Sequence, residues 1–461
     1  MILINSSTTT VVLARDQLRH PEPSMSNLKI HLTTFNCGLT PVDVDYFAAH
    51  LFDGLKTNLP PDLVVLSLQE IAPLGYSFLG GSLVKPYLSR FRDAVNAAAH
   101  QRFDDDGSYS NVVSTNLGMT ALIVLARHET RDRIWWVETA GVGVGLAAMG
   151  NKGAAAARLG LGGDGDDEGE TVLTFVAAHL APMEWNWERR NRDWQDICRG
   201  LVFERDVKAK ELRGRGSNAP ESERLLSTED GDIEVRQGSL FSPPSHVFFA
   251  GDLNYRTSDT APKPDDHENW PHPSQFVSQA YDDMFKGDQL NREKNAGNTL
   301  HKLAEVNIDF PPTYKYSKAA QEDAARGVAK NLNADIIRST STPWAKHRAP
   351  AWCDRILFLA AAPPKIHSYS AGPVQPTSDH RPVSLSFSVP TKPLGLTEAD
   401  AKPPYPVNAD WKEARAAARR YEFIVGIAAY LALTWEGEAL LAGSIVGVLG
   451  GYLVLRAMLG T

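Results

Sequence analysis

Residues 247–256 read Val-Phe-Phe-Ala-Gly-Asp-Leu-Asn-Tyr-Arg and join an apolar run to a carboxylate, an amide and a guanidinium. The apolar half predicts a buried β-strand. Side chains at i and i+2 leave an extended strand on the same side, so Asp252 and Asn254 should project together, with Arg256 beyond them. Such a trio can orient and deprotonate a water while it binds the oxygens of a phosphate. Taken alone, however, these residues are more typical of an ordinary β-turn.

Polar side chains also stand at the ends of other predicted strands, which span residues 28–36, 63–68, 171–179 and 383–389. Asn36, Glu70 and His179 close the first three strands, and Asp379-His380 precedes the fourth. His179 and His380 can therefore face the same edge of a sheet. A lone histidine is usually a surface or core residue, but two of them beside acidic partners favour a functional site.

Hydrophobic periodicity predicts further strands and helices along the chain. Strand-type segments lie at 111–117, 119–126, 134–138, 154–161, 246–250 and 354–361, and helix-type segments at 46–55, 83–100, 185–208 and near 273–286. Strand-rich halves with helices between them predict an α/β fold, in which two packed sheets are flanked by helices.

Two further motifs make the pattern specific. They are Pro-Pro-Thr-Tyr-Lys-Tyr at 311–316 and Arg-Ala-Pro-Ala-Trp-Cys-Asp-Arg-Ile-Leu at 348–357. Together with the strand-end motifs, they resemble the inositol polyphosphate 5-phosphatases of the endonuclease/exonuclease/phosphatase superfamily, over roughly Lys29 to Val389. The resemblance implies a four-layer α/β sandwich of two mixed sheets and a Mg²⁺-dependent enzyme that removes the 5-phosphate of phosphatidylinositol 4,5-bisphosphate. Ala177-Ala178 and Phe35 depart from the commoner residues of that family.

The resemblance also implies catalytic roles for five residues. Asp252 would activate the water and Asn254 would align it. His380 and Asp354 would form an oriented pair, and His179 would donate to a phosphoryl oxygen. The sequence leaves open whether Asp252 or a metal hydroxide takes the proton of the water.

Metal ligands are expected among hard oxygen donors. Mg²⁺ keeps several waters and accepts one or two carboxylates beside a phosphate oxygen, which suits Glu70 and Asn36. Alone, Gln69-Glu70 would be a solvated strand end. Because the resembled family uses the matching positions, we expect Asn36, Glu70 and Asp379 to hold Mg²⁺.

Substrate specificity is expected from a second group of mostly cationic residues. In the resembled family the residues that match Asn151-Lys152 contact the phosphate near the lipid glycerol. The residues that match Tyr314, Lys315, Lys346 and Arg348 bind the 4-phosphate there. Like charges gathered around one point repel each other unless an anion joins them. The expected substrate-binding residues are Arg256, Asn151, Lys152, Tyr314, Lys315, Lys346 and Arg348. Arg189 and Arg190 match a family motif too, although salt bridges at helical spacing explain them nearly as well.

Composition excludes several other functions. The 461 residues carry a formal net charge of −8, which gives no global attraction to nucleic acid. The three cysteines have no zinc-site spacing, and none has an arginine six residues later, which excludes thiolate phosphatase chemistry. The alternatives are a nuclease or sphingomyelinase of the same superfamily and a catalytically idle phosphoinositide-binding tether. The oligomeric state stays open.

Composition also predicts the domain boundaries. We expect an N-terminal extension over 1–27, a catalytic domain over 28–390 with a disordered insertion at about 209–245, and a proline-rich linker over 391–410.

The last region, 411–461, is expected to form a basic helix and a membrane anchor. From Tyr421 the chain is strongly apolar, and 439–455 holds 17 uncharged residues, the lower bound for a membrane span. Lys412, Arg415, Arg419 and Arg420 precede it, so the catalytic domain should face the cytosol. A thin bilayer such as the endoplasmic reticulum would suit this length, with a phosphoinositide membrane as the partner. Removal of 421–461 should then release a soluble, folded phosphatase.

Overall fold

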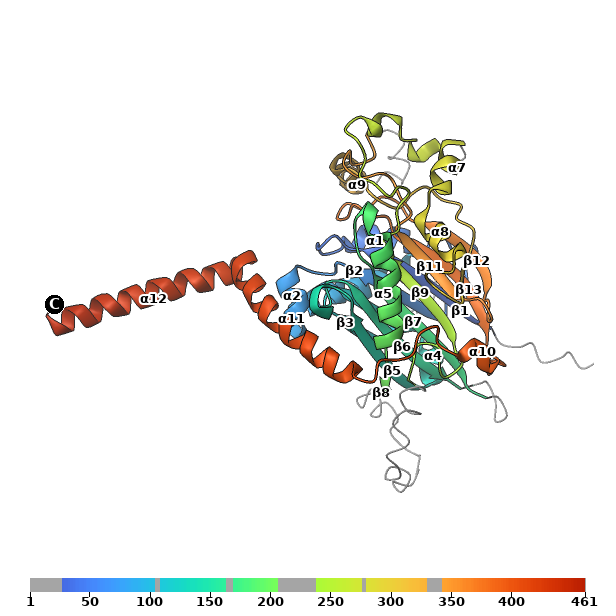
Figure 1. Ribbon diagram of the computed structural model, residues 1–461, viewed down its shortest axis with the longest axis horizontal. Coiled ribbons are helices and arrows are strands. Elements are labelled where there is room, and N and C mark those ends of the chain that lie inside the picture. The colour runs from blue at the N-terminus through green and yellow to red at the C-terminus, as the bar shows by residue number, and fades with distance from the viewer. Residues whose placement is uncertain are drawn as a thin grey trace, which may run out of the picture.

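The computed structural model describes residues 27–103, 108–162, 169–205, 238–275, 279–329 and 342–460. Two β-sheets pack face to face, and helices cover their outer faces (Figure 1). The predicted four-layer α/β sandwich is confirmed. The predicted N-terminal extension and most of the predicted insertion at 209–245 lie outside the described residues.

The first sheet has six strands in the order β12-β13-β1-β2-β4-β3. Its central strand β1 is parallel to β2 and antiparallel to β13, so both ends of the catalytic segment meet in the middle of this sheet. The strands are β1 (Asn27–Asn36), β2 (Leu63–Gln69), β3 (Ser110–Leu117), β4 (Thr120–Ala126), β12 (Lys365–Ala371) and β13 (Val383–Pro390). Strand β12 was not expected from the sequence, because as a partly exposed edge strand it lacks a continuous apolar run.

The second sheet has seven strands in the order β10-β11-β9-β7-β6-β5-β8. Strand β9, predicted from residues 246–250, lies near its centre between β7 and β11. The strands are β5 (Ile134–Gly143), β6 (Gly153–Leu161), β7 (Thr171–His179), β8 (Glu204–Arg205), β9 (His246–Asp252), β10 (Leu303–Glu305) and β11 (Asp354–Leu359).

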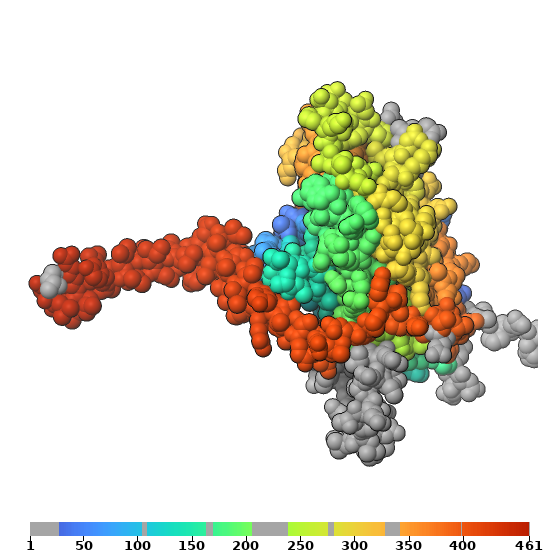
Figure 2. Space-filling model, viewed as in Figure 1, coloured from blue at the N-terminus to red at the C-terminus, as the bar shows by residue number. Residues whose placement is uncertain are grey.

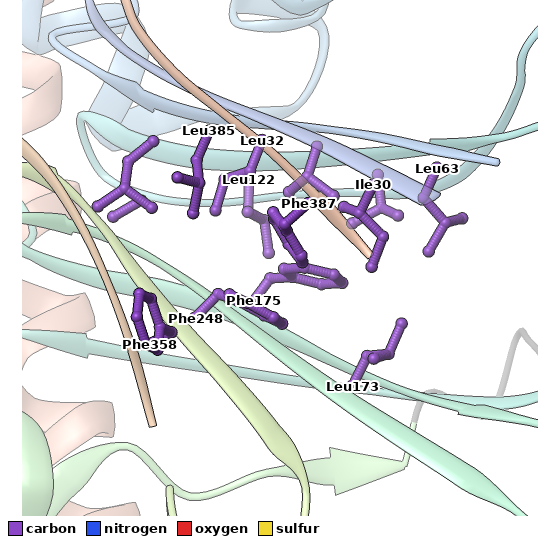
Figure 3. Packing of buried hydrophobic residues seen from close by; sticks show 14 of the residues in the cluster. Ile30, Leu32, Leu63, Leu122, Leu173, Phe175, Phe248, Phe358, Leu385 and Phe387 are labelled. Carbon is purple, nitrogen blue, oxygen red and sulfur yellow. The ribbon is translucent and has the colours of Figure 1, made fainter. Parts of the chain in front are cut away.

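The main core lies between the two sheets (Figure 3). The ring of Phe248 stacks on those of Phe175 and Phe387, with ring centroids 5.5 and 4.3 Å apart. Phe175 and Phe248 come from the seven-stranded sheet and Phe387 from the six-stranded one, so these rings join the two layers. Aromatic side chains bury large apolar areas, and this contact therefore fixes the sheets against each other.

Helices α1 (Val44–Leu51) and α3 (Lys85–Arg102) pack on the six-stranded sheet, and α5 (Trp187–Gly200) packs on the seven-stranded one. Helix α5 ends eight residues before the predicted end at 208. The buried Leu201 that follows it is extended, with φ −83° and ψ 90°, which stops the helix. In the part of the chain that the structure describes, the other α-helices of the sandwich are α2 (Leu74–Leu79), α4 (His128–Asp132), α7 (Gln279–Lys286), α8 (Gln289–Asn295), α9 (Lys318–Ala329) and α10 (Glu398–Ala401).

The segment 391–410, predicted as a linker, lies along the surface of the sandwich. The ammonium of Lys302 donates to the backbone carbonyls of Asp400 and Lys402 at 3.0 and 2.5 Å. The backbone N–H of Asn408 donates to the carbonyl of Arg199 at the end of α5, at 2.9 Å. These contacts bring the chain to the start of the last two helices.

The C-terminal region forms two helices with different surroundings. Helix α11 (Trp411–Leu433) lies against α2, whereas α12 (Trp435–Leu459) projects away from the body (Figures 1 and 2). A Cβ at Gly75 of α2 would lie 2.7 Å from the backbone nitrogen of Tyr430, so glycine allows this close approach. Within the described residues, α12 is the one helix long and apolar enough to cross a membrane, with mean hydropathy 1.8 and 0% of its apolar window buried. The helix that packs on the body thus ends at Leu433, and the exposed helix α12 begins after Thr434.

We predict that His31 makes the fold sensitive to acid. His31 belongs to β1 and is buried against α1, where its Nε2 lies 3.0 Å from the carbonyl of Leu51. Burial lowers the pKa of His31 from 6.5 to about 4. The unfolded chain therefore binds a proton that the folded chain excludes as the pH falls from 6.5 towards 4. This difference should cost about 3 kcal/mol of stability across that window.

Chemical denaturation at several pH values tests this prediction. His31→Gln should flatten the loss of unfolding free energy between pH 6.5 and 4, whatever its effect at neutral pH. His128→Gln is the control, because that side chain is 80% exposed. An unchanged slope in His31→Gln would contradict the prediction.

Candidate active site

Strand register brings the polar strand ends together. In the seven-stranded sheet, His179 of β7 pairs with Asp252 of β9, and Asp252 pairs with Asp354 of β11. In the six-stranded sheet, Asn36 of β1 pairs with Gln69 of β2, directly before Glu70. The strand ends of the two sheets are in contact, because Asn36 Nδ2 donates to Asp252 Oδ2 at 2.9 Å.

Asp252 is a buried carboxylate surrounded by donors. Besides Asn36, it receives the backbone N–H of Asn254 on Oδ1 at 3.1 Å, and His179 Nε2 lies 3.3 Å from Oδ2. Burial alone would raise its pKa, but the hydrogen bond from His179 and the charges of His380 and Lys152 outweigh burial and hold the pKa below its ordinary value. Asp252 is therefore ionised at neutral pH and accepts hydrogen bonds.

Asn254 lies beside Asp252 for a reason other than the expected one. Strand β9 ends at Asp252, and Asn254 has a left-handed backbone with φ +57°. Its Nδ2 donates to the carbonyl of Leu180 at 3.1 Å, and Arg256 Nη2 donates to its Oδ1. A turn, and not alternation along a strand, thus brings the three polar residues together. Such backbone strain is often concentrated at functional sites.

His380 and Asp354 form a buried pair. His380 Nδ1 lies 2.9 Å from Asp354 Oδ2, which also accepts from Thr313 Oγ1 at 2.6 Å. Burial lowers the pKa of His380, but the charges of Asp354 and Asp252 overcome it and raise the pKa to about 9. The ring of Tyr314 lies 4.5 Å from the His380 ring, centroid to centroid. The imidazole is thus held as a cation.

His179 lies between two charged side chains. Its Nε2 is 2.5 Å from Lys152 Nζ and 3.9 Å from Glu70 Oε1. Burial and the charge of Lys152 lower the pKa of His179, and burial also lowers the pKa of Lys152. His179 is therefore neutral while His380 is charged. Glu70 has φ +48°, a second left-handed residue at this site.

Some of the residues expected to contact substrate lie beside the catalytic side chains. Lys315 forms an ion pair with Asp379, and the Arg256 guanidinium lies 4.3 Å above the Tyr314 ring. Burial lowers the pKa of His347, and the charges of Lys315 and Arg348 lower it further, so both cations act on the same imidazole.

The remaining cations differ more from expectation. Arg348 Nε lies 3.8 Å from the buried Glu184, and Lys346 is exposed. Arg189 pairs with Asp193 at 2.8 Å, the helical salt bridge weighed above, and Arg190 is buried against backbone carbonyls. Asn151 follows Gly150 and is half-buried.

Comparison with known proteins agrees with this geometry. The model of "Endonuclease/Exonuclease/phosphatase family 2" matches residues 33–386. The chain belongs to that family. The type II inositol polyphosphate 5-phosphatase 15 of Arabidopsis thaliana is 29% identical over 79% of this chain and 32% of its own length, so the chain spans about a third of that relative. The type IV inositol polyphosphate 5-phosphatase 9 of the same plant is 27% identical over 79% of this chain and 78% of its own length.

A solved structure shows the same fold. It is the inositol polyphosphate 5-phosphatase domain of SPsynaptojanin, in complex with inositol (1,4)-bisphosphate and a calcium ion. It matches 87% of this chain and 90% of its own with a TM-score of 0.55 and 24% identity. The endonuclease/exonuclease/phosphatase family and its sandwich therefore account for the catalytic segment.

Two further members of the site were not assigned a role from the sequence. Thr313 donates to Asp354, and Ser378 Oγ donates to the carbonyl of Asn36 at 2.6 Å while it accepts from the N–H of His380. Thr313 lies inside the motif 311–316, and Ser378 directly precedes the pair Asp379-His380, so both positions were within reach of the sequence signal. Their role depends on contacts between distant segments, which a strand-end pattern does not contain.

The donor set fits a hard divalent cation. Glu70 and Asp379 supply carboxylate oxygens with 29% and 23% of their side chains exposed, and Asn36 supplies an amide. In the structure Asn36 Oδ1 accepts from the N–H of Gly38, and Asp379 pairs closely with Lys315. Glu70 Oε1 lies 3.6 Å from Lys152 Nζ, and this longer contact leaves Glu70 the carboxylate that a cation can recruit most easily. The nearby thiol of Cys37 is buried, which raises its pKa and makes it a poor ligand.

We predict that Mg²⁺ stabilises the fold through Glu70. A ligand that binds only the folded chain adds about 2.7 kcal/mol at about 100 times its Kd, so the melting temperature should rise with Mg²⁺ and fall again with a chelator. Glu70→Gln should remove most of this rise.

Glu129→Gln is the matched control, since that carboxylate is 74% exposed and distant in sequence from the site. A rise that is equal in Glu70→Gln and in the unchanged protein would place the cation elsewhere.

Proposed function

We propose that this chain is a Mg²⁺-dependent phosphoinositide 5-phosphatase that converts phosphatidylinositol 4,5-bisphosphate to phosphatidylinositol 4-phosphate. The observation that carries the proposal is the convergence of ionised Asp252, neutral His179 and cationic His380 within one buried edge, beside Lys152. The names of the relatives support the reaction class.

The chain's own residues account for the proton and charge movements. The attacking water donates a hydrogen bond to Asp252, which takes its proton as the oxygen bonds to phosphorus. The bond between phosphorus and the inositol 5-oxygen breaks, and that oxygen leaves protonated by solvent. His179, His380 and Asn254 surround the same point and stabilise the charge that develops on the phosphoryl oxygens.

Three residues, Glu70, Asn36 and Asp379, would hold Mg²⁺ in this reaction. When bound, Mg²⁺ neutralises phosphate charge and makes a coordinated water more acidic. Asp252, whose pKa lies below its ordinary value, is a weak base, and the more acidic water that a bound Mg²⁺ would supply offsets this weakness.

The 4-phosphate is expected to lie against the second group of cations. Lys315 and Arg348 both lie near His347, and Lys346 is exposed beside it. A nuclease or sphingomyelinase has no inositol 4-phosphate to bind, and an idle tether has no need of the Asp252 and His380 pairings. These features favour a phosphoinositide phosphatase over both alternatives.

We also propose that α12 spans a membrane. The sequence favours the membrane of the endoplasmic reticulum and predicts that the catalytic domain lies on its cytosolic face. Its 25 residues are about 37 Å long at 1.5 Å per residue, enough for a typical hydrocarbon core of about 30 Å. Arg419 and Arg420 lie on α11, between the catalytic domain and α12 along the chain. The substrate would then share a surface with the enzyme.

Asp252→Asn should lower kcat by about 10²–10⁴-fold, because the neutral amide cannot take the proton of water. Phosphate release from a short-chain phosphatidylinositol 4,5-bisphosphate measures the loss. Asp265→Asn, at an exposed position, is the control. Comparable kcat in a folded Asp252→Asn protein would contradict the assigned role.

Lys346→Ala combined with Arg348→Ala should weaken kcat/KM on phosphatidylinositol 4,5-bisphosphate at least about tenfold more than on phosphatidylinositol 5-phosphate. Hydrogen bonds to charged groups contribute about 1.5–3 kcal/mol each, and only the first lipid offers a 4-phosphate. Equal losses on the two lipids would show that these cations serve the reacting phosphate or the fold.

The full chain should stay with membranes after alkaline carbonate extraction, whereas a chain ended at Thr434 should be released. A chain ended at Arg420 should also melt at a lower temperature, since it lacks the buried Gly426 and Ala429 of α11. Removal of 421–461 is therefore expected to release a soluble phosphatase that is folded but less stable than the full chain. Release of the full chain by carbonate would contradict a span at α12.

A further inference from the structure

Helix α11 reaches the active-site loop through one buried carboxylate. The side chain of Glu422 is 4% exposed. Its Oε1 accepts a hydrogen bond from the backbone N–H of Gly150 at 2.8 Å, and its Oε2 lies 3.1 Å from Arg419 Nη1. A buried carboxylate is stable only with such partners, so Glu422 ties α11 to the loop at Gly150.

Gly150 is held on its other side as well. Its carbonyl accepts from the N–H of Met119 at 2.9 Å. A Cβ at Gly150 would lie 3.0 Å from both Glu422 Oε1 and the backbone nitrogen of Gly118. The peptide is therefore enclosed between α11 and the β3–β4 turn, and a shift of Glu422 acts on it directly.

Lys152 follows Gly150 by two residues and enters the active site. Its carbonyl accepts from the N–H of Val144 at 2.8 Å, and its Nζ lies against His179 and Glu70. The position of the Gly150 peptide thus helps set where the Lys152 ammonium lies.

We propose that Glu422 is a positioning residue for the phosphatase reaction, which acts by holding the Gly150 peptide so that Lys152 stays beside His179. The inference rests on the proposed function, because it takes Lys152 and His179 to face the substrate. Helix α11, which leads to the proposed membrane span, would then help to hold the active site in place.

A purely structural role for Glu422 is the competing explanation. Arg419 pairs with Glu422 and also donates to the carbonyls of Phe78 and Leu79, at 2.5 and 3.4 Å. Those contacts fasten α11 to α2 without Glu422. If Glu422 served only as a counter-charge to Arg419, its replacement would therefore affect stability alone. If Glu422 positions Lys152, its replacement also affects catalysis.

The test uses the full chain in detergent micelles and a short-chain phosphatidylinositol 4,5-bisphosphate. Glu422→Met fills the buried space but offers no carboxylate acceptor, and Glu422→Gln keeps a neutral acceptor. We expect kcat/KM to fall about tenfold in the first and about threefold in the second, because a hydrogen bond to a charged group is the stronger one. Glu413→Met, at an exposed position of the same helix, should change nothing.

A double-mutant cycle separates positioning from stability. In a Lys152→Met background, Glu422→Met should lower kcat/KM less than about twofold further, because the residue it positions is gone. Melting temperatures of the same samples report stability. A full tenfold loss in both backgrounds would overturn the inference.

The remaining outcomes are also decisive. If the unchanged protein releases no phosphate, the proposed function fails first, and the inference fails with it. If the unchanged protein is active and Glu422→Met behaves as Glu413→Met does, only the inference is overturned. If Glu422→Met does not fold, Glu422→Gln decides: a threefold loss that disappears with Lys152→Met supports positioning, and unchanged activity overturns it.

Discussion

The hydrogen bond from Asn36 to Asp252 joins the two sheets at the point where the site forms. Asn36 ends the central strand of one sheet and Asp252 ends β9 of the other, with 2.9 Å between Nδ2 and Oδ2. A second bond between the sheets, from Ser67 Oγ to the carbonyl of Ala250 at 2.9 Å, lies close behind it. Because Asp252 is buried and ionised, it needs donors such as Asn36 Nδ2 and His179, and the packing of both sheets has to provide them. The aromatic contacts of Phe248 keep the layers at the required separation.

The charged neighbours of His179 and His380 also give these two histidines different charge states. His380 faces Asp354 as well as Asp252 and is held as a cation, whereas His179 faces the ammonium of Lys152 and is neutral. Two imidazoles at the same edge can therefore serve different purposes. Lys152, whose charge adds to burial in lowering the pKa of His179, is carried on a loop that α11 contacts through Glu422. The helix that leads to the proposed membrane span is therefore packed against the loop that carries Lys152.

The sequence predicted the sandwich and the site segments because their signals are local. Apolar runs that end in Asn36, Glu70, His179 and Asp252 mark buried strands, and parallel or paired strand ends meet at one edge. Contacts formed between distant segments were not predictable in this way. The left-handed backbone of Asn254, the pairing of Lys315 with Asp379, and the support of Gly150 by Glu422 each depend on how separate elements pack. The apolar composition of 421–461 likewise gave no sign that α11 packs on the folded body as far as Tyr430.

The identity of the lipid product tests the central claim most directly. Phosphatidylinositol 4,5-bisphosphate should be incubated with the full chain and Mg²⁺, and the remaining lipid separated from phosphatidylinositol 4-phosphate and phosphatidylinositol 5-phosphate standards. The account predicts phosphatidylinositol 4-phosphate, with one inorganic phosphate released for each lipid consumed. Formation of phosphatidylinositol 5-phosphate, cleavage of the phosphodiester to diacylglycerol, or recovery of the intact lipid would contradict it.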